Sequence, residues 1–252
     1  MKKGIYLTFD IKLLSQLFTA AIAITFVSLA LAVDKSVSVF SSSVPEKKPV
    51  IIIDAGHGGE DGGTQSADGV LEKDINLSIC KKLEKILTRY GFETVMVRDS
   101  DKMIYDEGSS TVRSKKSSDL HNRMDIMKKY PDGIFLSIHQ NHFSESKYSG
   151  AQAFYCRTQG ESALLAESIQ KSIVSDLQNE NTRQIKPCTS DVYLIYNAVT
   201  TAVMVECGFM SNAEEAAKLS DNTYQYEMAL AISKGLMNYI KQKEADIYGS
   251  KN

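Results

Sequence analysis

The sequence predicts a single three-layer α/β domain, in which helices flank a central and mostly parallel sheet. Three short runs contain almost only apolar residues, which is typical of strands that are buried on both faces. They lie at residues 51–54, 134–138 and 203–205. Longer segments between them have apolar residues at three- and four-residue spacing, and this predicts amphipathic helices. Strands that alternate with helices favour a layered α/β fold with parallel strands.

The remaining elements follow from the same patterns. Four helices are expected at residues 74–90, 119–130, 162–177 and 223–241. Three further strands are expected at residues 93–98, 150–155 and 192–195. The acidic residues that follow Ser211 are typical of the first turn of a helix. Residues 99–117 are polar and without period, so we expect a loop or a flexible flap there.

The N-terminus has the pattern of an export signal. Three lysines precede an uncharged, mostly apolar run from Leu13 to Val33, and Ala30-Leu31-Ala32 fits a small-residue cleavage site. The run is also long enough, at about 20 residues, to remain as a membrane anchor. Both interpretations place the rest of the chain beyond the cytoplasmic membrane, as a secreted or a membrane-anchored protein.

Four segments are therefore expected along the chain. They are a signal peptide or membrane anchor at 1–33, a linker at 34–48, the α/β domain at 49–243 and a C-terminal tail at 244–252. The chain is 43% hydrophobic and 24% charged, which is the composition of a globular protein. The third segment alone is long enough to bury a full core.

Charge and cysteine spacing argue against two other classes of protein. The formal net charge is −2, and removal of residues 1–32 leaves 26 basic and 30 acidic residues. A nucleic-acid-binding protein would favour a basic face, so we expect no nucleic acid partner. The four cysteines include no CxxC pair, which argues against a zinc ribbon.

A glycine-rich loop follows the first apolar run. The run stops at Asp54, and five of the eight residues 56–63 are glycines, with His57 among them. Glycine at this density lets the backbone turn sharply and approach a ligand closely. A histidine at the end of a buried strand lies where α/β folds place their chemistry.

The other two apolar runs also lead into chemically active residues, His139 and Glu206, while Glu72 lies in the connection that leaves the glycine loop. Because the carboxyl ends of parallel strands share one edge of a sheet, we expect these side chains to converge with His57. Two histidines and one carboxylate are the three-ligand set of a hydrolytic zinc site. Such a site needs a further carboxylate to take a proton, and Glu206 is available.

Each of these residues also has a purely structural interpretation. His57 could lie in a solvated turn, and His139 could donate to a backbone carbonyl in the core. Glu72 could be an exposed acid at a helix start. Glu206 is the hardest to explain in this way, because a carboxylate directly after a buried apolar run must be paired, protonated or functional. His142 lies near the expected site and could contact a substrate.

Four longer motifs occur together in this chain. They are Ile53-Asp54-Ala55-Gly56-His57-Gly58-Gly59, Glu72-Lys73-Asp74-Ile75-Asn76-Leu77, Ser137-Ile138-His139-Gln140-Asn141 and Val205-Glu206-Cys207-Gly208-Phe209-Met210-Ser211-Asn212. Shorter ones pair Arg98 with Asp101 and Leu120 with Arg123. In this order they resemble the zinc-dependent N-acetylmuramoyl-L-alanine amidases, the large family of bacterial cell-wall hydrolases often called Amidase_3. The resemblance covers roughly residues 49–241.

The resemblance implies a zinc ion held by His57, Glu72 and His139, with Glu206 as the catalytic carboxylate. The implied reaction is hydrolysis of the amide between the lactyl group of N-acetylmuramic acid and the L-alanine of the stem peptide in peptidoglycan. The implied fold is one α/β domain with a central sheet between helices. Asn141 and His142 are expected to contact the substrate.

Within the family, the slim layout most resembles the germination-specific spore-cortex amidases of the CwlD type. Only ten residues separate His139 from Gly150, which leaves no room for the inhibitory insertion that some members carry there. This resemblance implies removal of stem peptides in the space between the forespore membranes, as a step toward muramic-δ-lactam. The implied partners are peptidoglycan glycan strands and a downstream deacetylase. Control by an accessory activator protein is one option that the sequence leaves open.

Two other classes of function remain open on the sequence. A zinc peptidase that acts within the stem peptide would use the same metal chemistry. A non-catalytic wall-binding module would keep the fold, but it would gain nothing from a buried and unpaired Glu206.

Overall fold

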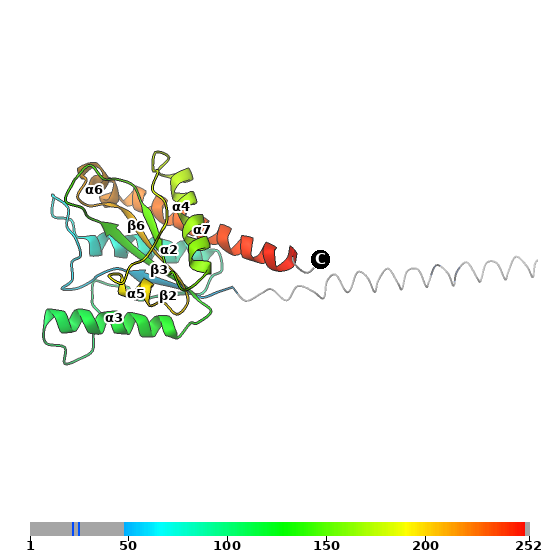
Figure 1. Ribbon diagram of the computed structural model, residues 1–252, viewed down its shortest axis with the longest axis horizontal. Coiled ribbons are helices and arrows are strands. Elements are labelled where there is room, and N and C mark those ends of the chain that lie inside the picture. The colour runs from blue at the N-terminus through cyan, green and yellow to red at the C-terminus, as the bar shows by residue number, and fades with distance from the viewer. Residues whose placement is uncertain (1–21, 23–24, 26–47, 250–252) are drawn as a thin grey trace, which may run out of the picture. The chain divides into compact units, whose positions relative to one another are not determined.

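A computed structural model of the chain describes residues 22, 25 and 48–249, and the compact unit begins at Lys48. A six-stranded sheet lies at its centre, between helices (Figure 1). The strands are β1 (Ile51–Ala55), β2 (Thr94–Met96), β3 (Ile134–Asn141), β4 (Gln152–Tyr155), β5 (Lys186–Pro187) and β6 (Thr201–Phe209). Their order is β2-β1-β3-β6-β4-β5, and every neighbouring pair except β4–β6 is parallel. The predicted fold class is confirmed.

Helices cover both faces of the sheet, as Figure 1 shows. One face carries α2 (Glu72–Arg89), α4 (Glu161–Asp176) and α7 (Asn222–Gly249). The other carries α3 (Val112–Lys128) and the short α5 (Tyr193–Tyr196). Helix α6 (Ala213–Ser220) packs against β6 and α7.

The central strands supply both cores. Ile51 and Ile53 of β1 pack on the α2 side, while Ile52 packs on the α3 side. In β3, Leu136 and Phe135 divide in the same way between the two faces. Because successive side chains of a strand point to opposite faces, burial of both faces requires an uninterrupted apolar run. This is why these strands are visible in the sequence.

Three elements differ from the expectation. Strand β5 (Lys186–Pro187) lies where no strand was expected. The predicted strand at 192–195 is wrong, because Tyr193–Tyr196 form one helical turn, α5. Helix α3 begins at Val112, although residues 112–117 were expected to be loop. A capping box holds its start, since the Thr111 side chain accepts from the backbone of Ser114 and the Ser114 side chain accepts from the backbone of Thr111.

The expected segment boundaries remain predictions. The signal peptide or anchor at 1–33 and the linker at 34–48 lie outside the described residues, except for Ile22, Thr25 and Lys48. In the part of the chain that the structure describes, no helix is long and apolar enough to cross a membrane. Helix α7 continues to Gly249 and so includes most of the segment that was expected to be a tail.

Candidate metal centre and active site

Three of the predicted site residues lie close enough together to hold one ion. One ligand atom each from His57, Glu72 and His139 lies within 4.8 Å of the other two. The Glu72 carboxylate lies between the two imidazoles, with Oε2 3.3 Å from His57 Nε2 and Oε1 3.0 Å from His139 Nδ1. Two imidazoles and one carboxylate are the donor set of a hydrolytic zinc site, so the residues fit this metal.

Glu72 is fixed by the backbone around it. It is the first residue of α2 and only 3% exposed. Its Oε1 accepts from the backbone of Gln140 at 3.0 Å, and its Oε2 accepts from the backbone of Thr64 at 2.9 Å. Burial alone would raise the pKa of Glu72, but hydrogen bonds and charges of His139 and His57 outweigh it and hold the pKa well below its usual range. The carboxylate is therefore ionised, as a metal ligand must be.

His57 is held in an uncommon backbone conformation. Its φ of 62° lies in the left-handed region, which non-glycine residues rarely adopt and which clusters at functional sites. Its Nδ1 lies 2.9 Å from Asp61 Oδ2, while Nε2 faces Glu72. A carboxylate on the second ring nitrogen is the usual way in which proteins orient a metal-binding histidine. Burial lowers the pKa of His57, but the hydrogen bonds and charges of Asp61 and Glu72 outweigh it and raise the pKa to about 9.

Two buried arginines fix the glycine loop that carries His57. Arg98 donates to the carbonyl oxygen of Gly56 at 2.9 Å, and Arg123 donates to that of His57 at 2.7 Å. Arg123 also pairs with the buried Asp54 at 2.6 Å. Buried carbonyl groups need such partners. The two short sequence motifs around Arg98 and Arg123 thus have a structural explanation, since both hold the loop.

Gly56 makes room for the ring of His139. A Cβ at this position would overlap the imidazole, which cannot rotate away without leaving Glu72. We expect Gly56→Ala to fold but to bind zinc at least tenfold more weakly, the size of effect of displacing a supporting group. Gly160→Ala is the matched control, because nothing lies within 4 Å of its Cβ position. Calorimetric zinc titration of both variants checks this; parent-like affinity in Gly56→Ala would contradict it.

Glu206 lies directly beside this cluster. It pairs in register with His139 across β6 and β3. Both strands run past these residues, to Phe209 and Asn141, so the side chains lie within the strands and not at the ends where they were expected. Glu206 Oε2 is buried and, among the described residues, has no hydrogen-bond partner. Burial raises the pKa of Glu206 to about 7. Buried polar atoms are rarely without a partner, so this oxygen is available to a group from outside the chain.

The two expected substrate contacts lie next in the chain. Asn141 is the last residue of β3 and half-buried, and its backbone oxygen accepts from Met210 at 2.8 Å. His142 follows it and is exposed. Their contact with a substrate remains a prediction.

Two residues near the site were missed by sequence reasoning. Asp61 lies in the glycine loop four residues after His57, and that spacing is the signal that could have identified it. Arg183 lies in an aperiodic polar stretch between α4 and β5, where nothing in the sequence marks it.

Comparison with known proteins adds a decisive observation. A family model described as N-acetylmuramoyl-L-alanine amidase matches residues 51–238, a span that contains all four site residues. The chain belongs to this family. The predicted family is thereby confirmed, and the four motifs lie within the matched span.

Individual amidases are similar over most of the chain. The germination-specific N-acetylmuramoyl-L-alanine amidase of Bacillus subtilis (strain 168) is 33% identical over 201 residues, which cover 80% of this chain and 84% of the relative. The CwlD amidase from Clostridioides difficile, solved in complex with the GerS lipoprotein, is 38% identical in sequence and has a TM-score of 0.74. The match covers 77% of this chain and 99% of the CwlD chain. The catalytic domain of the amidase CwlV from Bacillus (Paenibacillus) polymyxa var. colistinus is 27% identical with a TM-score of 0.65, and covers 77% and 99%.

Proposed function

We propose that this chain hydrolyses the amide between N-acetylmuramic acid and L-alanine in peptidoglycan, with one zinc ion held by His57, Glu72 and His139. The observation that carries the proposal is the buried Oε2 of Glu206, which has no hydrogen-bond partner within the described part of the chain. Glu206 is in register with His139, one of the three donors. A hydrolase needs a free carboxylate at that place. A wall-binding module would only incur the cost of burying it.

The residues divide the reaction between them. When bound, zinc supplies Lewis-acid chemistry, which lowers the pKa of water and stabilises negative charge on the scissile carbonyl oxygen. Glu206 accepts the proton of the attacking water and returns it to the leaving nitrogen of L-alanine. Asp61 keeps the His57 ring in the ligating orientation. Asn141 and His142, at the end of β3 and just beyond it, are the proposed substrate contacts.

Mass analysis of the products tests the bond that is cut. The purified domain, loaded with zinc and given muropeptides, should release peptides with a free L-alanine amino terminus and leave peptide-free glycan. Fragments cut within the stem peptide would instead mark a zinc peptidase. Binding without any cleavage would mark a wall-binding module.

Zinc uptake by the metal-free protein is expected to strengthen as the pH rises. Zinc binds neutral imidazole, whereas a pKa of about 9 keeps a proton on His57 at neutral pH. Zinc must displace the proton from His57. Below that pKa, each rise of one pH unit should therefore increase the apparent zinc affinity by about tenfold. Zinc titrations at several pH values check this, with Asp61→Asn as the comparison. That variant removes one cause of the raised pKa, so its affinity should stop rising at a lower pH than that of the parent. A parent affinity that does not change with pH would contradict the prediction.

We further propose that the reaction takes place in the spore cortex, between the forespore membranes, as a step toward muramic-δ-lactam. The similarity to a protein named germination-specific supports this. A deacetylase would then act on the peptide-free muramic residue. Spores of a strain that lacks this chain should contain no muramic-δ-lactam, and normal amounts of it would contradict the cortex role.

Export and an accessory protein complete the proposal. Peptidoglycan lies outside the cytoplasmic membrane, in agreement with the signal or anchor expected at 1–33. The relative from Clostridioides difficile was solved in complex with a lipoprotein, which supports a membrane-attached activator for this chain too. Fractionation and affinity purification from sporulating cells test both points; a chain that stays in the cytoplasm would contradict the first.

A further inference from the structure

The guanidinium of Arg183 has one buried N–H group without a hydrogen-bond partner among the described residues. Arg183 lies between α4 and β5 and is half-buried. Nη2 donates to Oε1 of Gln152, whereas Nε is buried and without a partner among the described residues. A guanidinium has five N–H donors in a fixed fork, and buried donors rarely remain unpaired in folded proteins. The unpaired Nε–H indicates an acceptor that comes from outside the chain.

Two neighbours hold the guanidinium at the catalytic end of the sheet. Gln152 is 2% exposed and is itself fixed, because its Nε2 donates to the backbone oxygen of Gln184 at 2.6 Å. The ring of Phe209 lies 4.9 Å from Arg183 Cζ. Gln152 pairs in register with Glu206 across β4 and β6, and Phe209 ends β6. Arg183 is therefore oriented beside the proposed catalytic residue.

Acidic side chains lie near this guanidinium, but among the described residues none forms an ion pair with it. Both carboxylate oxygens of Glu215 accept backbone hydrogen bonds. Oε1 accepts from the N–H of Gly150 at 2.9 Å, and Oε2 accepts from the N–H of Phe209 at 2.8 Å. Burial lowers the pKa of Arg183 and the negative charges of Glu215 and Glu206 raise it, but within the described part of the chain neither acid forms an ion pair with it. An arginine with a buried, unpaired N–H and no ion-pair partner among the described residues is available to an anion from outside.

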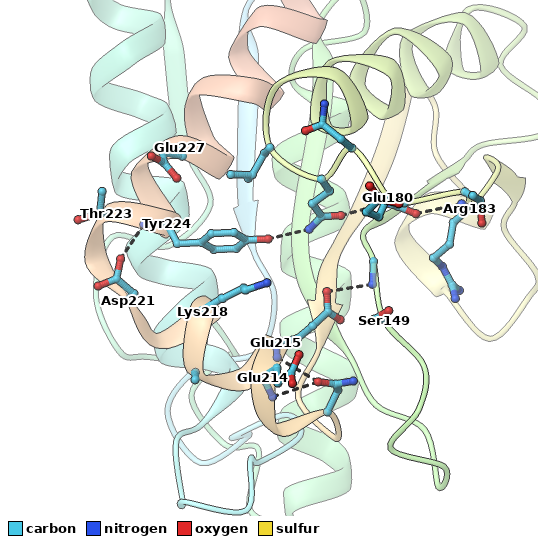
Figure 2. A pocket seen from close by; sticks show the side chains of 18 residues that line it. Ser149, Glu180, Arg183, Glu214, Glu215, Lys218, Asp221, Thr223, Tyr224 and Glu227 are labelled. Carbon is cyan, nitrogen blue, oxygen red and sulfur yellow. Dashed lines mark hydrogen bonds between the residues drawn. The ribbon is translucent and has the colours of Figure 1, made fainter.

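Arg183 also borders a cavity of about 1070 Å³. Figure 2 shows residues that line it: Arg183 and Ser149 lie on one side, and Tyr224 lies on the other. The cavity has the size of typical ligand sites, about 300–1000 Å³, and is large enough for a short peptide. An anion bound by Arg183 could thus belong to a larger ligand that continues into the cavity.

We propose that Arg183 binds a carboxylate of the stem peptide on the leaving side of the scissile amide, and that the cavity takes the rest of that peptide. The proposal deepens, and rests on, the proposed amidase function. In peptidoglycan the residue after L-alanine is D-glutamate, whose α-carboxylate is free because the peptide continues through the γ-carboxyl. Glu206 serves the alanine nitrogen, and the guanidinium beside it reaches the next residue. Arginine is suited to a carboxylate because its fork donates two parallel hydrogen bonds.

Two matched substrates test this recognition. One muropeptide carries D-glutamate after L-alanine, and the other carries D-isoglutamine, in which a carboxamide replaces the α-carboxylate. The zinc-loaded parent should prefer the carboxylate substrate in kcat/KM by about 10- to 100-fold, the size expected of charge-assisted hydrogen bonds. Arg183→Gln should lose this preference, mainly through a rise in KM for the carboxylate substrate that is much larger than any change with the carboxamide substrate. The rate on the carboxamide substrate reports on folding and on catalysis in the same sample.

Two more variants separate recognition from general charge. Arg183→Lys keeps the charge without the fork and should retain part of the preference. Lys186→Gln removes a cation from the same segment, on the exposed β5, and should retain all of it. Product binding supplies a readout apart from turnover: the parent should bind L-alanyl-D-glutamate at least tenfold more tightly than L-alanyl-D-isoglutamine.

Each outcome is decisive. No preference in the parent, or an equal loss on both substrates in Arg183→Gln, would overturn the role of Arg183. If Arg183→Gln did not fold, the role of Arg183 would still be tested by the substrate preference of the parent and by its partial loss in Arg183→Lys. A parent that hydrolyses neither substrate would contradict the proposed amidase function itself, which is a different result from the absence of a preference.

Discussion

A Glu206→Gln variant is expected to bind zinc like the parent and to lose about 10²- to 10⁴-fold in kcat, the usual contribution of a general acid–base group. Glutamine has nearly the same size but cannot take a proton from water. Glu206 lies outside the three donors, so metal affinity should not change. Burial disfavours the charged form of Glu206, so the variant should also be at least as stable as the parent.

The same change at Glu145 is the matched control. Glu145 is exposed in the loop that follows β3, and its carboxylate forms an ion pair with Lys147 at 2.6 Å. Replacing it with the amide should therefore leave turnover unchanged. Zinc content, thermal unfolding and release of L-alanine amino termini are measured side by side. A Glu206→Gln protein with parent turnover would remove Glu206 from the catalytic role. A loss of zinc would show instead that Glu206 helps to hold the metal.

The sequence could predict the parts of the fold whose burial requires a recognisable pattern of apolar residues. Strands β1, β3 and β6 are covered on both faces and therefore read as apolar runs. Helix α5 was mistaken for a strand because four residues with a buried Leu194-Ile195 pair suit either structure. The start of α3 carries no apolar period, since an ion pair of Lys115 with Glu60 at 2.6 Å holds it against the glycine loop. A contact across 55 residues cannot be read from local spacing.

The candidate site also contains residues that the sequence could predict and one that it could not. His57, Glu72, His139 and Glu206 could be found because each lies at or near the end of a recognisable apolar run or helix, and parallel strands bring such ends to one edge. Arg183 could not, because its position depends on Gln152, 31 residues away, in a segment without period. The residues of the metal centre could thus be predicted from the sequence, whereas Arg183 could be recognised only in the folded structure.

Removal of one metal ligand should have a larger effect on zinc than any other change. We expect His139→Ala to lose zinc by more than the roughly 10- to 100-fold that loss of an outer hydrogen-bond partner costs, and to lose activity with it. Asp61→Asn is the graded comparison, because Asp61 only orients His57. The fold should persist in His139→Ala, since Glu72 keeps the backbone donors of Gln140 and Thr64.

A readout without turnover makes this test independent of the reaction. A ligand that binds only the folded state stabilises it in proportion to the logarithm of its concentration over its Kd. Added zinc should therefore raise the Tm of the metal-free parent strongly, that of Asp61→Asn less, and that of His139→Ala hardly at all. Because Glu206→Gln should respond like the parent, the series separates the residues that hold the metal from the one that moves the proton. A full zinc-dependent shift in His139→Ala would take His139 out of the ligand set.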